Sequence, residues 1–385
     1  MKRPEMQTHR LAFVDALRGW AILGVMAVHC AQTVPGIWPG REYLAFGAFG
    51  VQLFYLVSAF TLCWVTYYLH KDNGSWRPFF IRRFLRIAPM YYVAIVICLV
   101  IYIFSSKDGI WSPIVEKYLW WSGGSERVSA AHVFANLIFF HGFNPFWINS
   151  LVPGGWTITV EFTFYAVFPF LFVHASTMWR ACVLTALSMV AAASAYLILK
   201  GIQPISPVYL WQNYLYMWFP AQLPFFCLGI ILFQFYRWLS DRSFANASFL
   251  GVMLISVSLS LLVFLASGGR VWLFPRHWTI GIAFAGLAAG LACNPMRFFV
   301  NVFTEKLGQL SYSCYIWHWF VISTLTALRD LACAEITYES PFLSFVATSC
   351  SVIALSAALS WLTWNYIEIP AIRLGKAFSK RAHSV

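Results

Sequence analysis

Apolar stretches long enough to cross a lipid bilayer recur along this chain of 385 residues. A helix needs about 20 apolar residues to span the hydrocarbon core. Only 10% of the residues are charged, against about 25% in soluble domains. The sequence therefore predicts an all-α polytopic membrane protein, not a soluble globular one. We expect about ten transmembrane helices, at residues 12–33, 43–69, 87–104, 156–174, 180–199, 213–236, 248–267, 277–293, 309–328 and 341–365.

The segment 132–148 leaves two interpretations open. It is apolar, but Asn136, His141, Gly142 and Pro145 interrupt it. Polar backbone at membrane depth is tolerated where it is buried in protein or lines a wet cavity. We therefore expect either a short or re-entrant helix or a further span.

The distribution of Lys and Arg predicts the orientation. With both termini in the cytoplasm, most of the 26 basic residues fall on the inner side, as the positive-inside rule requires. The net charge of +12 then reflects topology and contact with lipid headgroups. No nucleic-acid partner is expected, because that would require a soluble basic domain.

We expect a single integral-membrane domain over residues 1–385. The first apolar run carries Asp15 and Arg18 and lacks a small-residue cleavage site, so it does not resemble a signal peptide. The nine cysteines are scattered without a metal-binding spacing. The sequence thus predicts no metal site and no separate soluble catalytic domain.

The stretch "LRGWAILGVMAVH", residues 17–29, places Arg18 and His29 eleven positions apart in an apolar run. This spacing puts both on one helix face, about 16 Å apart along the axis, with Asp15 near the same stripe. Ionisable groups within spans are candidates for function. The alternative is equally strong for these residues alone: Arg18 reaches the inner headgroups and His29 is a satisfied buried histidine.

A second cluster lies in "WRPFFIRRFLRIAPMYYV", residues 76–93. Arg83 and Arg86 are one helical turn apart and could hold phosphate groups from one side, with Arg82 beside them. Anchoring by positive charge at the cytoplasmic surface explains such a cluster equally well.

The stretch "GGWTITVEFTFYAVFPF", residues 154–170, carries Glu161 about five residues inside an apolar run, flanked by Thr157, Thr159 and Tyr165. A carboxylate at this depth needs a partner. The candidates are His29, an Arg, or a substrate hydroxyl, and a purely structural ion pair is the alternative.

In "SYSCYIWHWFV", residues 311–321, His318 lies between two tryptophans. Packing at the membrane interface explains the tryptophans, but it does not explain the histidine. His318 is therefore a candidate site residue.

Taken together, these motifs resemble the membrane-bound acyltransferase type 3 family, whose members O-acylate bacterial polysaccharides and include O-antigen acetyltransferases. The resemblance extends over essentially the whole chain. Two departures are Ala59, where the family has Gly, and Thr157, where it has Ser. The matching positions are Arg18 and His29; Gly47, Gly50, Val51, Phe54 and Tyr55; Arg83 and Arg86; Trp156, Thr157, Ile158 and Glu161; Ser311, Tyr312, Tyr315 and His318; and Glu368 and Pro370.

The resemblance implies an acyl-CoA-dependent O-acyltransferase in the bacterial inner (cytoplasmic) membrane. Acetyl-CoA would be the acyl donor, and a surface polysaccharide or glycolipid would be the acceptor. Acetyl is preferred over succinyl or another acyl group because it is the commonest group in the family. The implied site residues are His29, Glu161 and Arg18 for catalysis, Arg83, Arg86 and Arg18 for the CoA phosphates, and Asp15, Trp156, Tyr165 and His318 for the acceptor.

Several alternatives stay open at this point. His29 could deprotonate the sugar hydroxyl for direct attack on the thioester, with Glu161 orienting the imidazole or the acceptor, or it could carry the acyl group covalently. A transporter would use Arg18, His29, Glu161 and His318 as a proton or anion path. A structural protein would tolerate their substitution.

Overall fold

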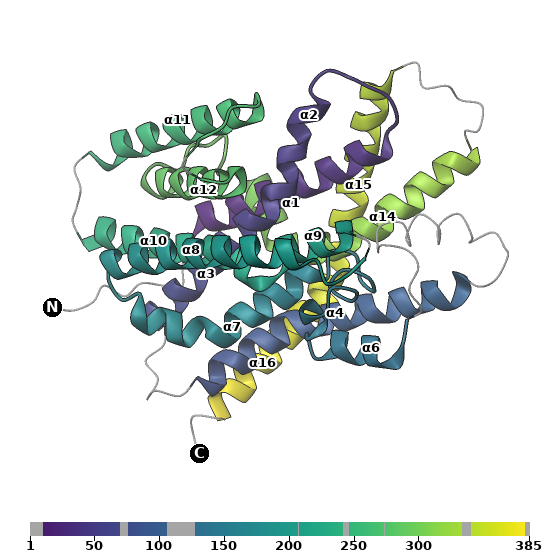
Figure 1. The fold of residues 1–385 in the computed structure, drawn as a ribbon, viewed down its shortest axis with the longest axis horizontal. Coiled ribbons are helices and arrows are strands. Elements are labelled where there is room, and N and C mark those ends of the chain that lie inside the picture. Colours follow the sequence, from purple (N-terminus) through teal and green to yellow (C-terminus); the bar gives the residue numbers. More distant parts are fainter. Residues whose placement is uncertain are drawn as a thin grey trace.

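The computed structural model describes residues 11–69, 76–105, 128–206, 208–241, 246–272, 274–332 and 340–381. Within these ranges the chain is helical and forms no strand (Figure 1), which confirms the all-α prediction. The long helices are α1 (Ala12–Thr33), α3 (Gly50–Leu69), α4 (Arg77–Ser105), α7 (Trp156–His174), α8 (Met178–Ile202), α10 (Phe219–Asp241), α11 (Ala247–Ala266), α12 (Arg276–Cys293), α14 (Ser311–Ala332) and α15 (Pro341–Thr363).

Short elements connect or flank these helices. They are α2 (Arg41–Leu44), η1 (Ala45–Phe49), α6 (Ala130–Leu137), η2 (His141–Phe143), α9 (Val208–Met217), α13 (Val302–Gln309), η3 (Trp364–Glu368) and α16 (Ile369–Arg381). α6 has 8 residues and is only about 12 Å long, too short to cross a bilayer. Of the two interpretations of segment 132–148, the structure therefore supports the short helix.

All ten predicted spans coincide with long helices, and within the described ranges eight stretches are long and apolar enough to cross a membrane. The chain is thus a multi-pass membrane protein. α12 and α14 are not among the eight. α12 begins with Arg276 and His277, and α14 carries His318 among several hydroxyl groups, so polar residues lower the hydropathy of both helices.

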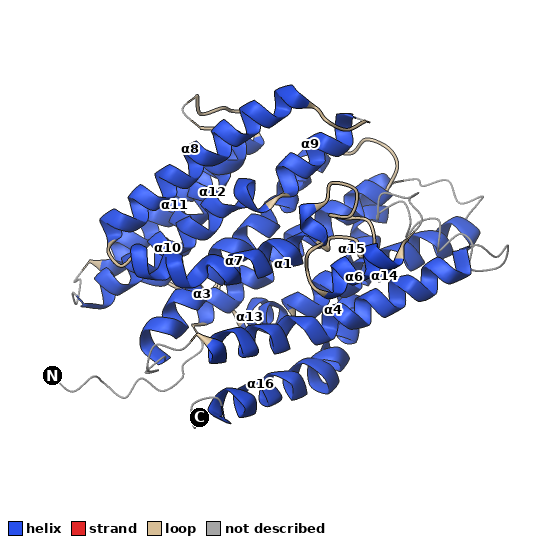
Figure 2. Cartoon of the chain, turned by 60° about the horizontal axis from the view of Figure 1, so that its bottom comes forward, coloured by secondary structure: helices blue, strands red, loops and turns tan. Residues whose placement is uncertain are grey.

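α1 lies inside the helix bundle and packs against α3, α13, α14 and α15. Around it, α10 packs against α3, α8 and α12, and α11 pairs with α12. Figure 2 shows α16 running beside α4 at the edge of the molecule. Because α1 lies inside the bundle, most of its apolar side chains are buried.

Two glycines let α1 and α13 meet backbone to backbone. A Cβ built on Gly308 would lie 1.7 Å from the carbonyl oxygen of Asp15, and one on Gly19 would lie 2.1 Å from the carbonyl oxygen of Thr304. No side chain fits at either position without moving a helix. The contact therefore fixes the helical turn that carries Asp15 and Arg18.

We expect Gly308→Ala to lower the thermal midpoint of the detergent-purified protein, because overpacking a close contact costs about 1–3 kcal/mol. Gly201→Ala is the matched control, since nothing lies within 4 Å of its added methyl group and the position is helical. Its stability should stay equal or rise slightly. Equal midpoints for the two variants would contradict the close approach of α1 and α13.

Candidate active site

A cavity between α1, α3, α4, α7 and α14 brings together most of the charged groups singled out in the sequence. It encloses about 720 Å³ of empty space, counting its open mouth. Its wall mixes apolar side chains with guanidinium, carboxylate and hydroxyl groups. The polar lining residues are Arg18, Tyr55, Ser58, Thr61, Arg83, Arg86, Thr157, Glu161, Tyr165, Ser311, Tyr312 and Tyr315.

Two hydroxyl groups hold the carboxylate of Glu161. Ser58 Oγ on α3 donates a hydrogen bond to Glu161 Oε1 at 2.8 Å, and Tyr165 OH, one turn along α7, donates to the same oxygen. The guanidinium of Arg83 lies 6.0 Å from the centre of the Tyr165 ring. Glu161 is thus held by hydroxyls, with positive charge nearby. The contact with His29 considered from the sequence is not formed.

Arg18 is anchored by α3 and by its own helix. Its Nη2 donates a hydrogen bond to Thr61 Oγ1 at 3.0 Å, and its Nη1 lies 3.5 Å from Asp15 Oδ1. Because Thr61 Oγ1 also donates to the carbonyl of Val57, the threonine is itself held in place. The side chain of Arg18 is 15% exposed, so most of it is enclosed by protein.

A second cavity shares three lining residues with the first, namely Arg18, Thr61 and Arg86. It encloses about 1090 Å³ of empty space, again counting its open mouth. Its other lining residues include Asp15 of α1 and Lys376 of α16. Asp15 is buried. Two arginines therefore border both cavities.

The three arginines at the start of α4 separate into two groups. Arg83 and Arg86 both line the first cavity, as their spacing of one turn predicts. Arg82 turns to α16, where its Nη1 donates to Ser379 Oγ at 2.5 Å. Within this short sequence, Arg83 and Arg86 therefore line the cavity, while Arg82 attaches α4 to α16.

The two histidines form a pair outside the linings of both cavities. His29 Nδ1 of α1 lies 3.1 Å from His318 Nε2 of α14. The ring of Trp319 packs against His29 with centroids 4.1 Å apart. Tyr315, which lines the first cavity, lies one turn before His318, and their ring centroids are 5.5 Å apart. The pair therefore lies next to Tyr315, at one side of the first cavity.

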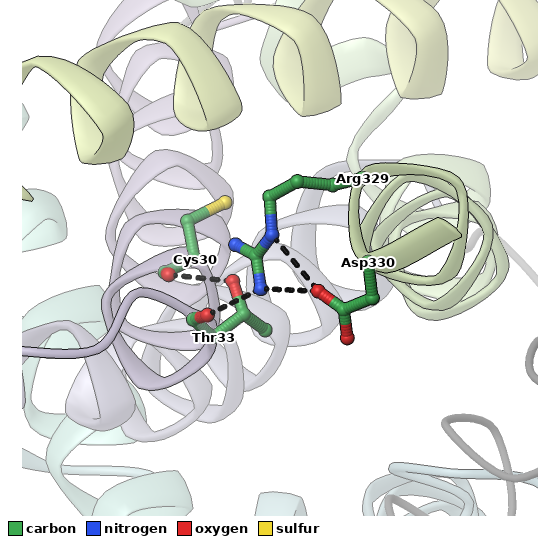
Figure 3. A network of polar contacts seen from close by, with 4 residues as sticks. All are labelled: Cys30, Thr33, Arg329 and Asp330. Atoms are coloured by element: carbon green, nitrogen blue, oxygen red, sulfur yellow. Dashed lines mark hydrogen bonds and ion pairs between the residues drawn. The ribbon is translucent and has the colours of Figure 1, made fainter. Parts of the chain in front are cut away.

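Arg329 joins α1 and α14 at the C-terminal end of α1 (Figure 3). Its Nη2 donates to the carbonyl of Thr33 at 3.1 Å and to Asp330 Oδ1, also at 3.1 Å. Thr33 Oγ1 in turn donates to the carbonyl of Cys30 at 2.9 Å. A cation at a helix C-terminus is favourable, because the last carbonyls of a helix have no partner within it. Arg329 thus helps to hold α1 against α14.

Tyr55, a motif position in the sequence, lines the first cavity, although the sequence predicted no site role for it. Its hydroxyl is buried and has no hydrogen-bond partner among the described residues, while its ring stacks on Phe226 with centroids 4.6 Å apart. The signal was present, because Tyr55 stands where the family motif has its second Phe. Trp156, assigned to the acceptor above, contacts Tyr55 edge to face at 6.3 Å but is not part of the cavity lining.

His141, which interrupts the apolar segment 132–148, is a further buried histidine for which the sequence predicted no site role. Thr159 Oγ1 lies 3.0 Å from its Nε2, and the carbonyl of Gly155 and the hydroxyl of Tyr91 are within 3.3 Å of the same nitrogen. Burial lowers the pKa of His141 to about 4, so the imidazole is neutral at physiological pH. Its contacts bind the loop before α7 to α4. No group of three or more His, Cys, Asp or Glu in the described ranges is arranged to hold a metal.

The chain belongs to the acyltransferase domain family, whose model matches residues 11–361. This match covers α1 to α15 and so includes both cavities and the histidine pair, apart from the residues contributed by η3 and α16. It confirms the resemblance stated from the sequence. No solved structure matches the chain.

The curated relatives that match this chain are named as O-acetyltransferases. YrhL of Bacillus subtilis, provisionally named a peptidoglycan O-acetyltransferase, is 23% identical over 97% of this chain and 57% of its own. The O-acetyltransferase OatA of Staphylococcus aureus is 22% identical over 95% of this chain and 58% of its own. The peptidoglycan O-acetyltransferase OatA of Listeria monocytogenes is 22% identical over 94% of this chain and 56% of its own. The chain thus spans somewhat more than half the length of these relatives.

We expect Thr61→Val to lower the unfolding midpoint of the purified protein. The change keeps the side-chain shape but removes the hydroxyl that accepts from Arg18, and a hydrogen bond to a charged group contributes about 1.5–3 kcal/mol. Thr66→Val on the same helix is the control, because the buried Thr66 hydroxyl has no partner among the described residues. A midpoint for Thr61→Val at or above that of the control would show that Arg18 does not depend on Thr61.

Proposed function

We propose that this protein is a membrane O-acyltransferase that moves an acetyl group from cytoplasmic acetyl-CoA to a hydroxyl of an extracytoplasmic surface polysaccharide. The observation that carries the proposal is that two cavities share Arg18 and Arg86 as lining residues, with Glu161 lining one of them and the histidine pair next to Tyr315 of that same cavity. The family match and the names of the relatives support acyl transfer. They favour it over a proton or anion transporter.

The arginines are suited to an anionic donor. Guanidinium groups bind phosphate oxygens through paired hydrogen bonds. Arg83 and Arg86 come from α4 and Arg18 from α1, so three positive charges approach the cavities from two helices. The phosphates of acetyl-CoA would lie on the side of the second cavity, where Lys376 adds a further charge. The pantetheine arm would then extend into the first cavity.

The reaction requires a base and a hydrogen-bond donor. His29 takes the proton from the acceptor hydroxyl while the hydroxyl oxygen attacks the carbonyl carbon of the thioester. A C–O bond forms and the C–S bond breaks. The proton then passes from His29 to the leaving CoA thiolate. The hydroxyl of Tyr55, which has no hydrogen-bond partner among the described residues, is a donor suited to a carbonyl oxygen of the bound donor. In a covalent route, His29 would carry the acetyl group between donor and acceptor. Glu161 would hold the acceptor hydroxyl or the arginines.

The names of the relatives and the predicted topology support the proposed acceptor and location. Two of the three relatives carry peptidoglycan O-acetylation in their names, which supports a cell-surface polysaccharide as acceptor. A donor from the cytoplasm and an acceptor on the outside require a protein that crosses the bacterial inner membrane. Both termini would lie in the cytoplasm, in agreement with the positive-inside rule.

The proposal is tested by mass spectrometry of surface polysaccharide from cells that express wild type, His29→Ala or His174→Ala at equal membrane levels. His174 is the control because it lies at the exposed end of α7 and contacts only its own helix. Wild type and the control should add one acetyl increment per modified repeat. His29→Ala should lose about 10²–10⁴-fold of the rate, the usual contribution of a general base.

The same three samples separate the possible failures. Equal increments in all three would remove His29 from the reaction. An absent increment in all three would reject acetyl transfer to surface polysaccharide. Acetyl-CoA binding by the His29→Ala protein should match wild type, because His29 is not among the residues that line either cavity.

We expect Arg86→Ala to weaken binding of CoA to the detergent-purified protein by about 10- to 100-fold, since losing a hydrogen bond to a charged group costs about 1.5–3 kcal/mol. Arg237→Ala is the control: Arg237 packs on the Tyr67 ring of α3 at 4.3 Å, away from both cavity linings. Titration calorimetry measures both. Equal affinity in the two variants would remove Arg86 from the donor site.

A further inference from the structure

The two imidazoles meet edge to edge. His29 Nδ1 and His318 Nε2 are 3.1 Å apart, while the ring centroids are 5.3 Å apart and the ring planes differ by only 10°. When two rings are parallel and their nearest nitrogens are much closer than their centroids, the rings face each other through their edges. The contact therefore has the geometry of an in-plane N–H···N hydrogen bond.

A backbone carbonyl decides the direction of this hydrogen bond. His318 Nδ1 lies 3.2 Å from the carbonyl oxygen of Cys314. A carbonyl oxygen only accepts, so His318 Nδ1 carries the proton, and in a neutral imidazole the other nitrogen is then an acceptor. His318 Nε2 must accept from His29 Nδ1–H. The tautomer of His29 that results has its lone pair on Nε2, where a general base needs it.

The surroundings favour positioning over substrate contact for His318. Its side chain is 0% exposed, whereas His29 is half-buried. Trp319 packs against both rings, with centroids 4.1 Å from His29 and 4.6 Å from His318. The link from Arg329 to the carbonyl of Thr33 holds the two helices together one turn beyond His29.

We propose that His318 is a positioning residue that fixes the tautomer and orientation of His29 through the chain Cys314 carbonyl, His318, His29. This inference rests on the proposed function, because it assigns His29 Nε2 as the group that takes the acceptor proton. During the step, His29 becomes an imidazolium, and its Nδ1–H bond to His318 strengthens because the donor is then charged. The histidine and the carbonyl together do what a carboxylate does in many acid–base sites.

Three variants test the proposal by separating the two nitrogens of His318. His318→Asn keeps an amide donor near the Nδ1 position, toward Cys314, but removes the acceptor for His29. His318→Gln places an amide oxygen near the Nε2 position and so keeps the acceptor. His318→Ala removes both. Each is purified in detergent and assayed for transfer from radiolabelled acetyl-CoA to a soluble glycan acceptor, next to wild type and His29→Ala.

We expect His318→Asn and His318→Ala to lower kcat about 10- to 100-fold while KM for acetyl-CoA stays within about threefold, because a lost hydrogen bond to the base affects the transfer step. His318→Gln should recover most of the wild-type kcat. Thermal midpoints are measured on all variants. If His318 served only in packing, His318→Asn and His318→Gln would both have lower midpoints than wild type.

Two results would overturn the proposal. One is a kcat for His318→Asn equal to that of wild type. The other is an equal loss of kcat in His318→Gln and His318→Asn at equal thermal midpoints. Failure of the proposed function looks different, because wild type itself would then transfer no acetyl group in the assay.

Discussion

Charged groups inside apolar helices are the constraint on which the rest of this structure depends. An ionised side chain within a span is costly unless it has hydrogen-bonding partners or contact with water. Glu161 is held by hydroxyls from α3 and α7, and Arg18 by a hydroxyl of α3 and a carboxylate of α1. The helices that supply these partners also enclose the cavity. The contacts that offset the cost of burying the charges therefore also form the candidate site.

α1 connects the parts of the site. One end carries Arg18, which lines both cavities, and Asp15, which lines the second, and the other end carries His29 against α14. Glycines at the contact with α13 and the hydrogen bond from Arg329 to Thr33 fix the helix near both ends. A helix held in this way keeps a constant distance between Arg18 and His29, because it hardly stretches along its axis.

The sequence predicted the membrane class, the positions of the spans and the grouping of Arg18, Arg83, Arg86 and Glu161. These depend on local properties: the length of an apolar run, the spacing of one helical turn, and the rarity of charge in a span. Ser58 and Thr61 of α3 were missed, although they hold Glu161 and Arg18. A hydroxyl in an apolar helix gives no signal by itself, since it can bond to its own backbone.

What the sequence by itself determined is the chemistry available: a multi-pass helical protein carrying arginines, a carboxylate and two histidines at membrane depth. Only the tertiary structure decided which of these groups meet. His29 and His318 are separated by 289 positions, and no local pattern relates them. Helix packing turned His29 toward His318 while hydroxyls took up Glu161, because side-chain partners across helices depend on how whole helix faces fit together.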